Sequence, residues 1–72
     1  MKYEDAKNLK KGDLVVIDIN RCKIYGGMIL EVESINPNCY HARCHVTMKQ
    51  PGFDNDFRIK DYDSRLLKRY EP

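Results

Sequence analysis

The chain has 72 residues and a mass of 8.5 kDa, with 13 Lys and Arg against 11 Asp and Glu and a pI near 8.5. This length predicts one small domain over residues 1–72, with little room for a deep catalytic pocket beside a core. The net charge of +2 permits nucleic-acid binding, but the pI stays below the value of about 9 that marks basic binders.

Residues 1–11 are predicted to form a short helical turn. Tyr3, Ala6 and Leu9 recur at a spacing of three, with acidic residues early and lysines late, as the helix macrodipole favours. Gly12 is placed to end the segment. The alternative is an extended arm whose Leu9 plugs one end of the core.

Two strands are predicted next, separated by a turn in "INRCK" and by Gly26 and Gly27, which suit a bulge or a sharp bend. In the first strand Val15, Ile17 and Ile19 share the inner face, and Leu14, Val16 and Asp18 share the outer one. In the second strand Met28, Leu30 and Val32 point inward, and Ile29, Glu31 and Glu33 point outward.

The second half of the chain predicts three more strands. "NPN", residues 36–38, is expected to form a turn, and alternation over residues 39–48 indicates the third strand. A loop around Pro51 and Gly52 precedes "FRIK", a short strand with Phe57 and Ile59 inward. A tight turn in "DYDS", of simple or 3-10 type, leads to a closing strand in "RLLKRY".

This pattern predicts an all-β fold, a small closed or nearly closed barrel of about five antiparallel strands with a short N-terminal helical turn. Its interior is assigned to Val15, Ile17, Met28, Leu30, Val32, Ala42, Cys44, Val46, Phe57 and Ile59. "LKKGDLVVI", "YGGMILEV" and "DYDSRLLKR" together resemble the Src-homology-3-like (SH3-like) barrels of the KOW, Tudor and related small bacterial and phage domains. Such domains open on a Gly-Asp-x-Val-x-Val strand and close with an acidic tight turn before a Leu-rich strand. The resemblance spans residues 9 to 69 and implies a fold without naming a partner.

Two recognition modes of that group are not expected here. A domain that binds proline-rich peptides would show an acidic, aromatic first loop and a Trp, whereas this chain has no Trp and a basic loop. An aromatic cage for methyl-lysine needs three or four convergent rings. Tyr40 and Phe57, two of the candidates, are already assigned to the core.

The segment "CYHARCH", residues 39–45, raises the question of zinc or catalysis. Strand alternation places Cys44 on the opposite face from Cys39, His41 and His45, so four ligands do not converge and no metal is expected. A nucleophilic cysteine needs a base and an orienting partner in a cleft, which this segment does not supply. We therefore expect a non-catalytic protein without a cofactor.

A small binding module is the remaining class. In the favoured reading it docks a protein partner through its barrel surface, where Leu14, Val16 and Ile29 form an apolar patch unless the N-terminal segment covers them. The alternative is a nucleic-acid-binding barrel that uses Arg43, Arg58 and Lys60 on strand faces with aromatic side chains nearby. The candidate partner-binding residues are Arg21, Lys23, Tyr25, Ile29, His41, Arg43, Phe53, Arg58 and Lys60.

The expected compartment is the cytoplasm. Three cysteines, an odd count, favour a reducing environment over a disulfide scaffold. The N-terminal residues carry acidic side chains and lack the apolar core of a signal peptide. No apolar run approaches the roughly 18 residues of a spanning helix. We expect a monomer with no membrane partner and no small-molecule substrate.

Overall fold

The computed structural model describes residues 1–38, 43–52 and 57–71. In this part of the chain five antiparallel strands form one sheet, with a short helix at the N-terminus, which confirms the predicted all-β fold. The elements are α1 (Tyr3–Ala6), β1 (Leu14–Ile17), β2 (Ile29–Asn38), β3 (Arg43–Lys49), β4 (Arg58–Asp63), a 3-10 helix η1 (Ser64–Leu66) and β5 (Leu67–Arg69).

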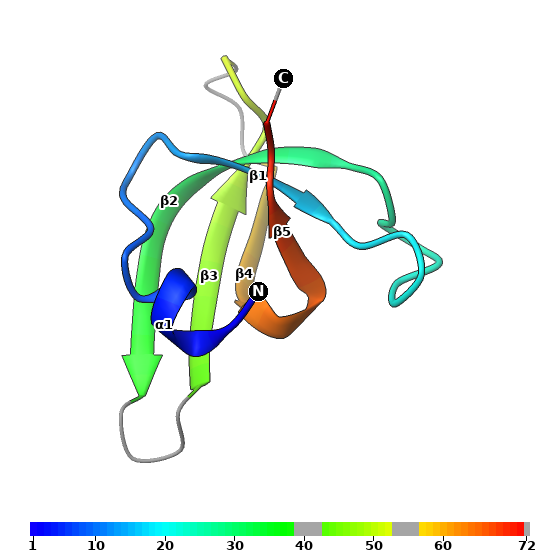
Figure 1. Cartoon of the computed structure of the whole chain (residues 1–72). Coiled ribbons are helices and arrows are strands. Elements are labelled where there is room, and N and C mark those ends of the chain that lie inside the picture. Colours follow the sequence, from blue (N-terminus) through cyan, green and yellow to red (C-terminus); the bar gives the residue numbers. More distant parts are fainter. Residues whose placement is uncertain (39–42, 53–56, 72) are drawn as a thin grey trace.

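The sheet has the strand order β4-β3-β2-β1-β5, so the last strand lies beside the first. β2 is long and curved and links the two halves of the sheet (Figure 1). β1 pairs with the beginning of β2, as in Val16 opposite Ile29, and β3 pairs along most of β2. η1 turns the chain so that β5 can pair with the free side of β1, with Lys68 opposite Val16.

The core lies on the inner face of this coiled sheet. Its strand residues are fully or almost fully buried: Val15, Ile17, Leu30, Val32, Cys44, Val46, Met48 and Leu67. Ala6 and Leu9 are buried in the same cluster, so the N-terminal segment covers one end of the core. Each such aliphatic side chain stabilises the fold by about 1.5–3 kcal/mol relative to an exposed position.

The N-terminal segment adopts the predicted helical turn rather than an extended arm. α1 is a single turn that ends at Ala6, and it packs against β3 and η1. Leu9 lies beyond the helix yet is only 4% exposed. Gly12 belongs to the next turn, just before β1, where its φ of 98° requires the freedom of glycine.

Two residues predicted on the inner face are exposed. Ile19 is 66% exposed because β1 ends at Ile17 and the chain turns at Asp18, so the alternation does not reach it. Phe57 is 37% exposed because it precedes β4, which begins at Arg58. Met28 and Ile59 are partly buried against the core. Tyr40 and Ala42 lie outside the described residues.

The predicted turn at residues 36–38 is wrong, because β2 continues through them. Pro37 lies opposite Cys44 and Asn38 lies opposite Arg43. A strand with neighbours on both sides uses all of its N–H groups, and a proline has none to donate. However, β1 pairs with β2 only at residues 29–31, so β2 has no neighbour on that side at Pro37. At Pro37 β2 therefore has β3 as its single partner strand, and an edge position of this kind tolerates a proline.

Two β-bulges change the alternation of the strands. In β2 the register shifts between Val32 and Ser34, which makes Glu33 an extra residue and lets Ile35 point inward. In β4 the shift falls between Ile59 and Tyr62. There Asp61 adopts a φ of 51°, and its N–H donates to the Thr47 hydroxyl at 3.3 Å.

Candidate functional site

The outer face of β2, β3 and β4 holds basic residues that are neutralised by glutamates. Arg58 Nε contacts Glu33 Oε2, and Lys49 Nζ lies 3.4 Å from Glu31 Oε2. These side chains are only 22% to 35% exposed. The predicted phosphate contact Arg58 is therefore part of an ion-pair ladder that crosses the three strands.

The structure does not bring the predicted nucleic-acid residues into one patch. Arg43 begins β3 opposite Asn38, whereas Lys60 lies in the β4 bulge that faces Thr47. Four residues of β3 separate the two levels, which is roughly 13 Å. His41 and Phe53 lie outside the described residues.

Exposed apolar side chains gather instead on the connection between β1 and β2. Of the five large exposed hydrophobic residues of the described chain, three lie in this connection and a fourth is the first residue of β2. We call these four the loop patch: Ile19 (66% exposed), Ile24 (83%), Tyr25 (37%) and Ile29 (39%). The connection projects beyond the sheet (Figure 1). A large aliphatic side chain that is four-fifths exposed gains little from folding, so these residues are candidates for contact with a partner.

The loop patch stands on a backbone held by hydrogen bonds. The Asp18 carbonyl accepts from the N–H groups of Arg21 and Cys22, both at 3.0 Å, and Gly27 N–H donates to the Ile17 carbonyl at 2.7 Å. A Cβ at Gly26 would lie 2.6 Å from Ile19 Cα, so the two limbs of the loop touch. These contacts hold the backbone of the loop in one conformation.

The loop also carries two cations without an ion pair in the described chain, Arg21 and Lys23. Six other cations, among them Lys68 beside Asp18 at 3.9 Å, have carboxylate partners. Arg21 lines a shallow hollow together with Lys2, Arg65 and the acidic Asp5. Arg21 and Lys23 thus add positive charge to the loop that carries the loop patch.

The N-terminal segment leaves this side of the sheet open. α1 packs against β3 and η1. Leu14 and Val16 are half-buried on the outer face of β1, and Val16 lies directly opposite the exposed Ile29. Ile29 thus continues the apolar surface from the loop onto the sheet.

Sequence reasoning found Tyr25 and Ile29 but missed Ile19 and Ile24. The alternation assigned Ile19 to the inner face of the first strand, and Ile24 received no assignment, because apolar residues in a loop lack the periodicity that identifies a strand or a helix. The sequence does contain a signal for these two residues: Ile19 and Ile24 flank the polar stretch "NRCK", and isoleucine is not a residue that solvated turns favour.

Cys22 lies at the base of the same loop. Its Sγ accepts from the Tyr25 N–H at 3.4 Å. The Tyr62 hydroxyl is shielded from water and falls short of a regular hydrogen bond, yet its contact is the largest cause that lowers the pKa of the Cys22 thiol. Burial, followed by that thiol, raises the pKa of Tyr62 to about 12.

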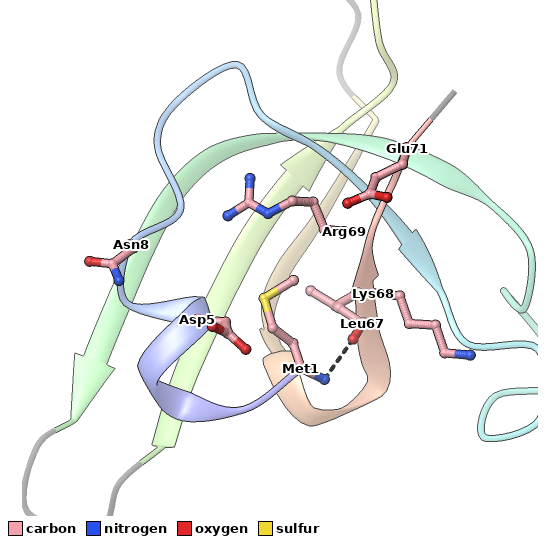
Figure 2. Close-up of a pocket in the computed structure, with 7 residues that line it drawn as sticks. All are labelled: Met1, Asp5, Asn8, Leu67, Lys68, Arg69 and Glu71. Atoms are coloured by element: carbon pink, nitrogen blue, oxygen red, sulfur yellow. Dashed lines mark hydrogen bonds between the residues drawn. The ribbon is translucent and has the colours of Figure 1, made fainter.

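A groove of about 450 Å³ lies between α1 and β5 (Figure 2). Asp5 and Asn8 line it on one side, and Arg69 and Glu71 line it on the other. The Met1 ammonium group donates to the Leu67 carbonyl at 2.7 Å on its floor. Among the residues that line this groove, only Leu67, Lys68 and Arg69 belong to a motif singled out in the sequence, "DYDSRLLKR".

Two further predictions concern a metal site and a membrane-spanning helix. No group of three or more His, Cys, Asp or Glu in residues 1–38, 43–52 and 57–71 is placed to hold a metal ion. Cys39 and His41 fall outside these ranges, so the absence of zinc stays a prediction. None of the helices described there is long and apolar enough to cross a membrane.

Comparisons with family models, curated proteins and solved structures returned no match to this chain. What can be stated of its class is the fold itself, a five-stranded antiparallel sheet with a helical N-terminal piece.

Proposed function

We propose that this chain is a non-catalytic binding module that docks a protein partner through the loop patch. The observation that carries the proposal is the exposure of Ile19, Ile24 and Tyr25 on a hydrogen-bonded loop and of Ile29 where that loop enters β2. Interfaces place aliphatic and aromatic anchors at their centre and polar residues at their rim. The loop patch has this composition.

We also propose that the fold belongs to the SH3-like barrels. Support comes from the position of the two motifs that carry the resemblance. "GDLVVI" leads into and forms β1, "DYDSRLLKR" runs from β4 through η1 to β5, and β1 and β5 are paired neighbours. The strands coil around one core, as a small barrel requires.

The charge around the loop patch indicates the chemistry of the partner. Arg21 and Lys23 are exposed and have no carboxylate partner in the described chain. An acidic surface with apolar side chains at its centre would complement them, since opposite potentials steer association and the apolar contacts supply affinity.

Nucleic acid remains the alternative partner, with less support. The ladder of Glu31, Glu33, Lys49 and Arg58 reduces the positive potential where phosphates were expected to lie. Arg43 and Lys60 are exposed but stand at different levels of the sheet.

Quantitative capture from a lysate of the native host, with three forms of the full chain as bait, tests the proposal. Ile24→Asp places a charge in the loop patch and should reduce recovery of the partner at least tenfold, because burying an unpaired charge costs several kcal/mol. Asn36→Asp adds the same charge at an exposed position of β2 and should recover as much partner as the parent.

Salt distinguishes the two partner classes. Capture through an apolar contact should change little between about 50 and 200 mM salt, whereas a protein with 6–10 phosphate contacts loses about 10³- to 10⁵-fold in affinity. The proposal is wrong if Ile24→Asp recovers as much partner as Asn36→Asp. It is also wrong if DNA or RNA oligonucleotides bind at about 50 mM salt and account for the captured material.

A further inference from the structure

β5 presents one free edge. The Asp18 N–H donates to the Leu66 carbonyl, and the Tyr70 N–H donates to the Leu14 carbonyl, so the even-numbered residues of this segment point their backbone groups at β1. Because these groups alternate along a strand, those of the odd-numbered residues point away from β1. β5 is the last strand of the sheet, so no strand of the described chain lies on that side.

The backbone groups on this edge are only partly used. The Leu67 N–H donates to the Ser64 carbonyl within η1, and the Leu67 carbonyl accepts from the Met1 ammonium group. The N–H and C=O of Arg69 and the N–H of Glu71 have no hydrogen-bond partner among the described residues. They lie beside the groove between α1 and β5, whose lining residues are drawn in Figure 2.

The groove has the dimensions of a strand site. Its volume of about 450 Å³ lies in the range of about 300–1,000 Å³ in which proteins hold ligands. Leu67 to Glu71 spans roughly 13 Å of edge, which is enough for about four residues of extended chain. The hydrogen bond from the Met1 ammonium group to the Leu67 carbonyl shows that a group from another segment already bonds to this edge of β5 (Figure 2).

We propose that this groove binds an extended segment of a partner protein, which adds to the sheet as a strand beside β5. Main-chain hydrogen bonds to Arg69 and Glu71 supply the register, as in other cases of strand addition. A second copy of the chain is the less suitable occupant, because Asp5 of α1 and the nearby Asn8 line the opposite side of the groove, where the further strands of a second sheet would have to lie. The site is separate from the loop patch and does not depend on it.

The charged side chains along the free edge of β5 indicate which charges a bound segment should carry. Arg69 and Glu71 lie two residues apart on one face, and the Arg69 side chain is 45% exposed beside Asp13. Oppositely charged side chains are favoured at directly opposed positions. The bound segment should therefore carry an acidic and a basic residue two positions apart.

The test begins with a displayed library of random linear heptapeptides, selected on the full chain. Selected peptides are synthesised and added to the isotopically labelled protein, and amide hydrogen exchange is followed by NMR. The Arg69 N–H should exchange rapidly in the free protein and at least about tenfold more slowly with peptide, since it becomes hydrogen-bonded. The Lys68 N–H, which faces β1, should not change.

Two variants at one position provide the matched control. Arg69→Ala keeps the backbone N–H and loses only the exposed ion pair of the side chain, so peptide binding should fall no more than a few-fold. Arg69→Pro removes only the donor that faces the groove, because β1 does not use it, and should weaken binding about tenfold for one lost hydrogen bond and the altered edge. If Arg69→Pro does not fold, a peptide N-methylated at the bonding positions replaces it and should show the same loss.

Several outcomes overturn the proposal. These are a selection that yields no peptide protecting Arg69, equal binding by Arg69→Pro and Arg69→Ala, and protection of Arg69 that rises with protein concentration in the absence of peptide. The last result would identify a second copy as the occupant. Ile24→Asp should leave peptide binding intact, so failure of the loop patch and failure of the groove are separate results.

Discussion

At the scale of single residues, the environment of a side chain decides properties that its type does not reveal. Cys22 and Cys44 are the same type of residue, but their surroundings differ. Cys22 lies at the base of an exposed loop, and the Tyr62 hydroxyl and the Tyr25 N–H lower the pKa of its thiol. Cys44 is 1% exposed in the core, and burial raises the pKa of its thiol. The two thiols should therefore differ strongly in reactivity.

Alkylation measures this difference. With iodoacetamide near neutral pH, Cys22 should react at least about tenfold faster than Cys44, because the thiolate is the reacting form and the core excludes the reagent. Mass spectrometry of the digested peptides gives the two rates. Tyr62→Phe should slow the reaction of Cys22 by removing the hydroxyl. Equal rates for both cysteines in the folded parent would contradict this assignment.

At the scale of elements, predictions held where periodicity was strong and failed where pairing decided the outcome. β1 and the beginning of β2 follow from the alternation of β-branched residues. The extension of β2 through Pro37 does not, because it depends on β1 being too short to reach that level. Ile19 and Ile24 of the candidate site were missed for a related reason: local pattern does not reveal which apolar residues find no partner.

η1 is held by a charged cap. The Asp63 carboxylate accepts from the Arg65 N–H at 2.9 Å and from the Arg65 guanidinium at 2.7 Å. Hydrogen bonds from the Arg65 side chain lower the pKa of Asp63 to about 2. A depressed pKa means that the carboxylate stabilises the fold above its ordinary pKa of 3.8, and that this stabilisation disappears as the pH falls through about 2.

The variant Asp63→Asn tests the cap. It should lower the free energy of unfolding by about 1 kcal/mol near neutral pH, the usual cost of a lost capping contact. Since asparagine does not titrate, the difference from the parent should stay constant above pH 4 or so and shrink toward pH 2. Urea unfolding at a series of pH values gives both curves. A difference that is independent of pH would show that the charge of Asp63 does not contribute.

At the scale of the whole molecule, one core accounts for the fold. The inner residues predicted from alternation were largely confirmed, since Val15, Leu30 and Val46 are fully buried. Leu67 joins them because η1 returns the chain to β1, a contact between distant segments that sequence periodicity cannot supply. The ion pair between Arg58 and Glu33 also joins segments that are distant in sequence. It neutralises the charge of a residue that was predicted to contact phosphate.

Val46→Asp should abolish cooperative folding, because it places an unpaired charge at a position of β3 that is 0% exposed. Asn36→Asp adds the same charge at an exposed position on the neighbouring strand and should melt within a few degrees of the parent. Thermal unfolding followed by circular dichroism compares the three proteins. A cooperative melt of Val46→Asp near that of the parent would refute the assigned core.

The two β-bulges have a further consequence, because they stand at the same level of the sheet. Glu33 of β2 and the residues before Tyr62 of β4 are both inserted around Thr47 of the intervening strand. The three neighbouring strands β2, β3 and β4 therefore bend at one level, which is marked by Glu33, Thr47 and Asp61. This bend separates the part of the sheet that is bonded to β1 from the far ends of β2 and β3. A change of length in the hairpin beyond this bend would alter its reach while the register of the core stays the same, so this end of the molecule is free to diverge.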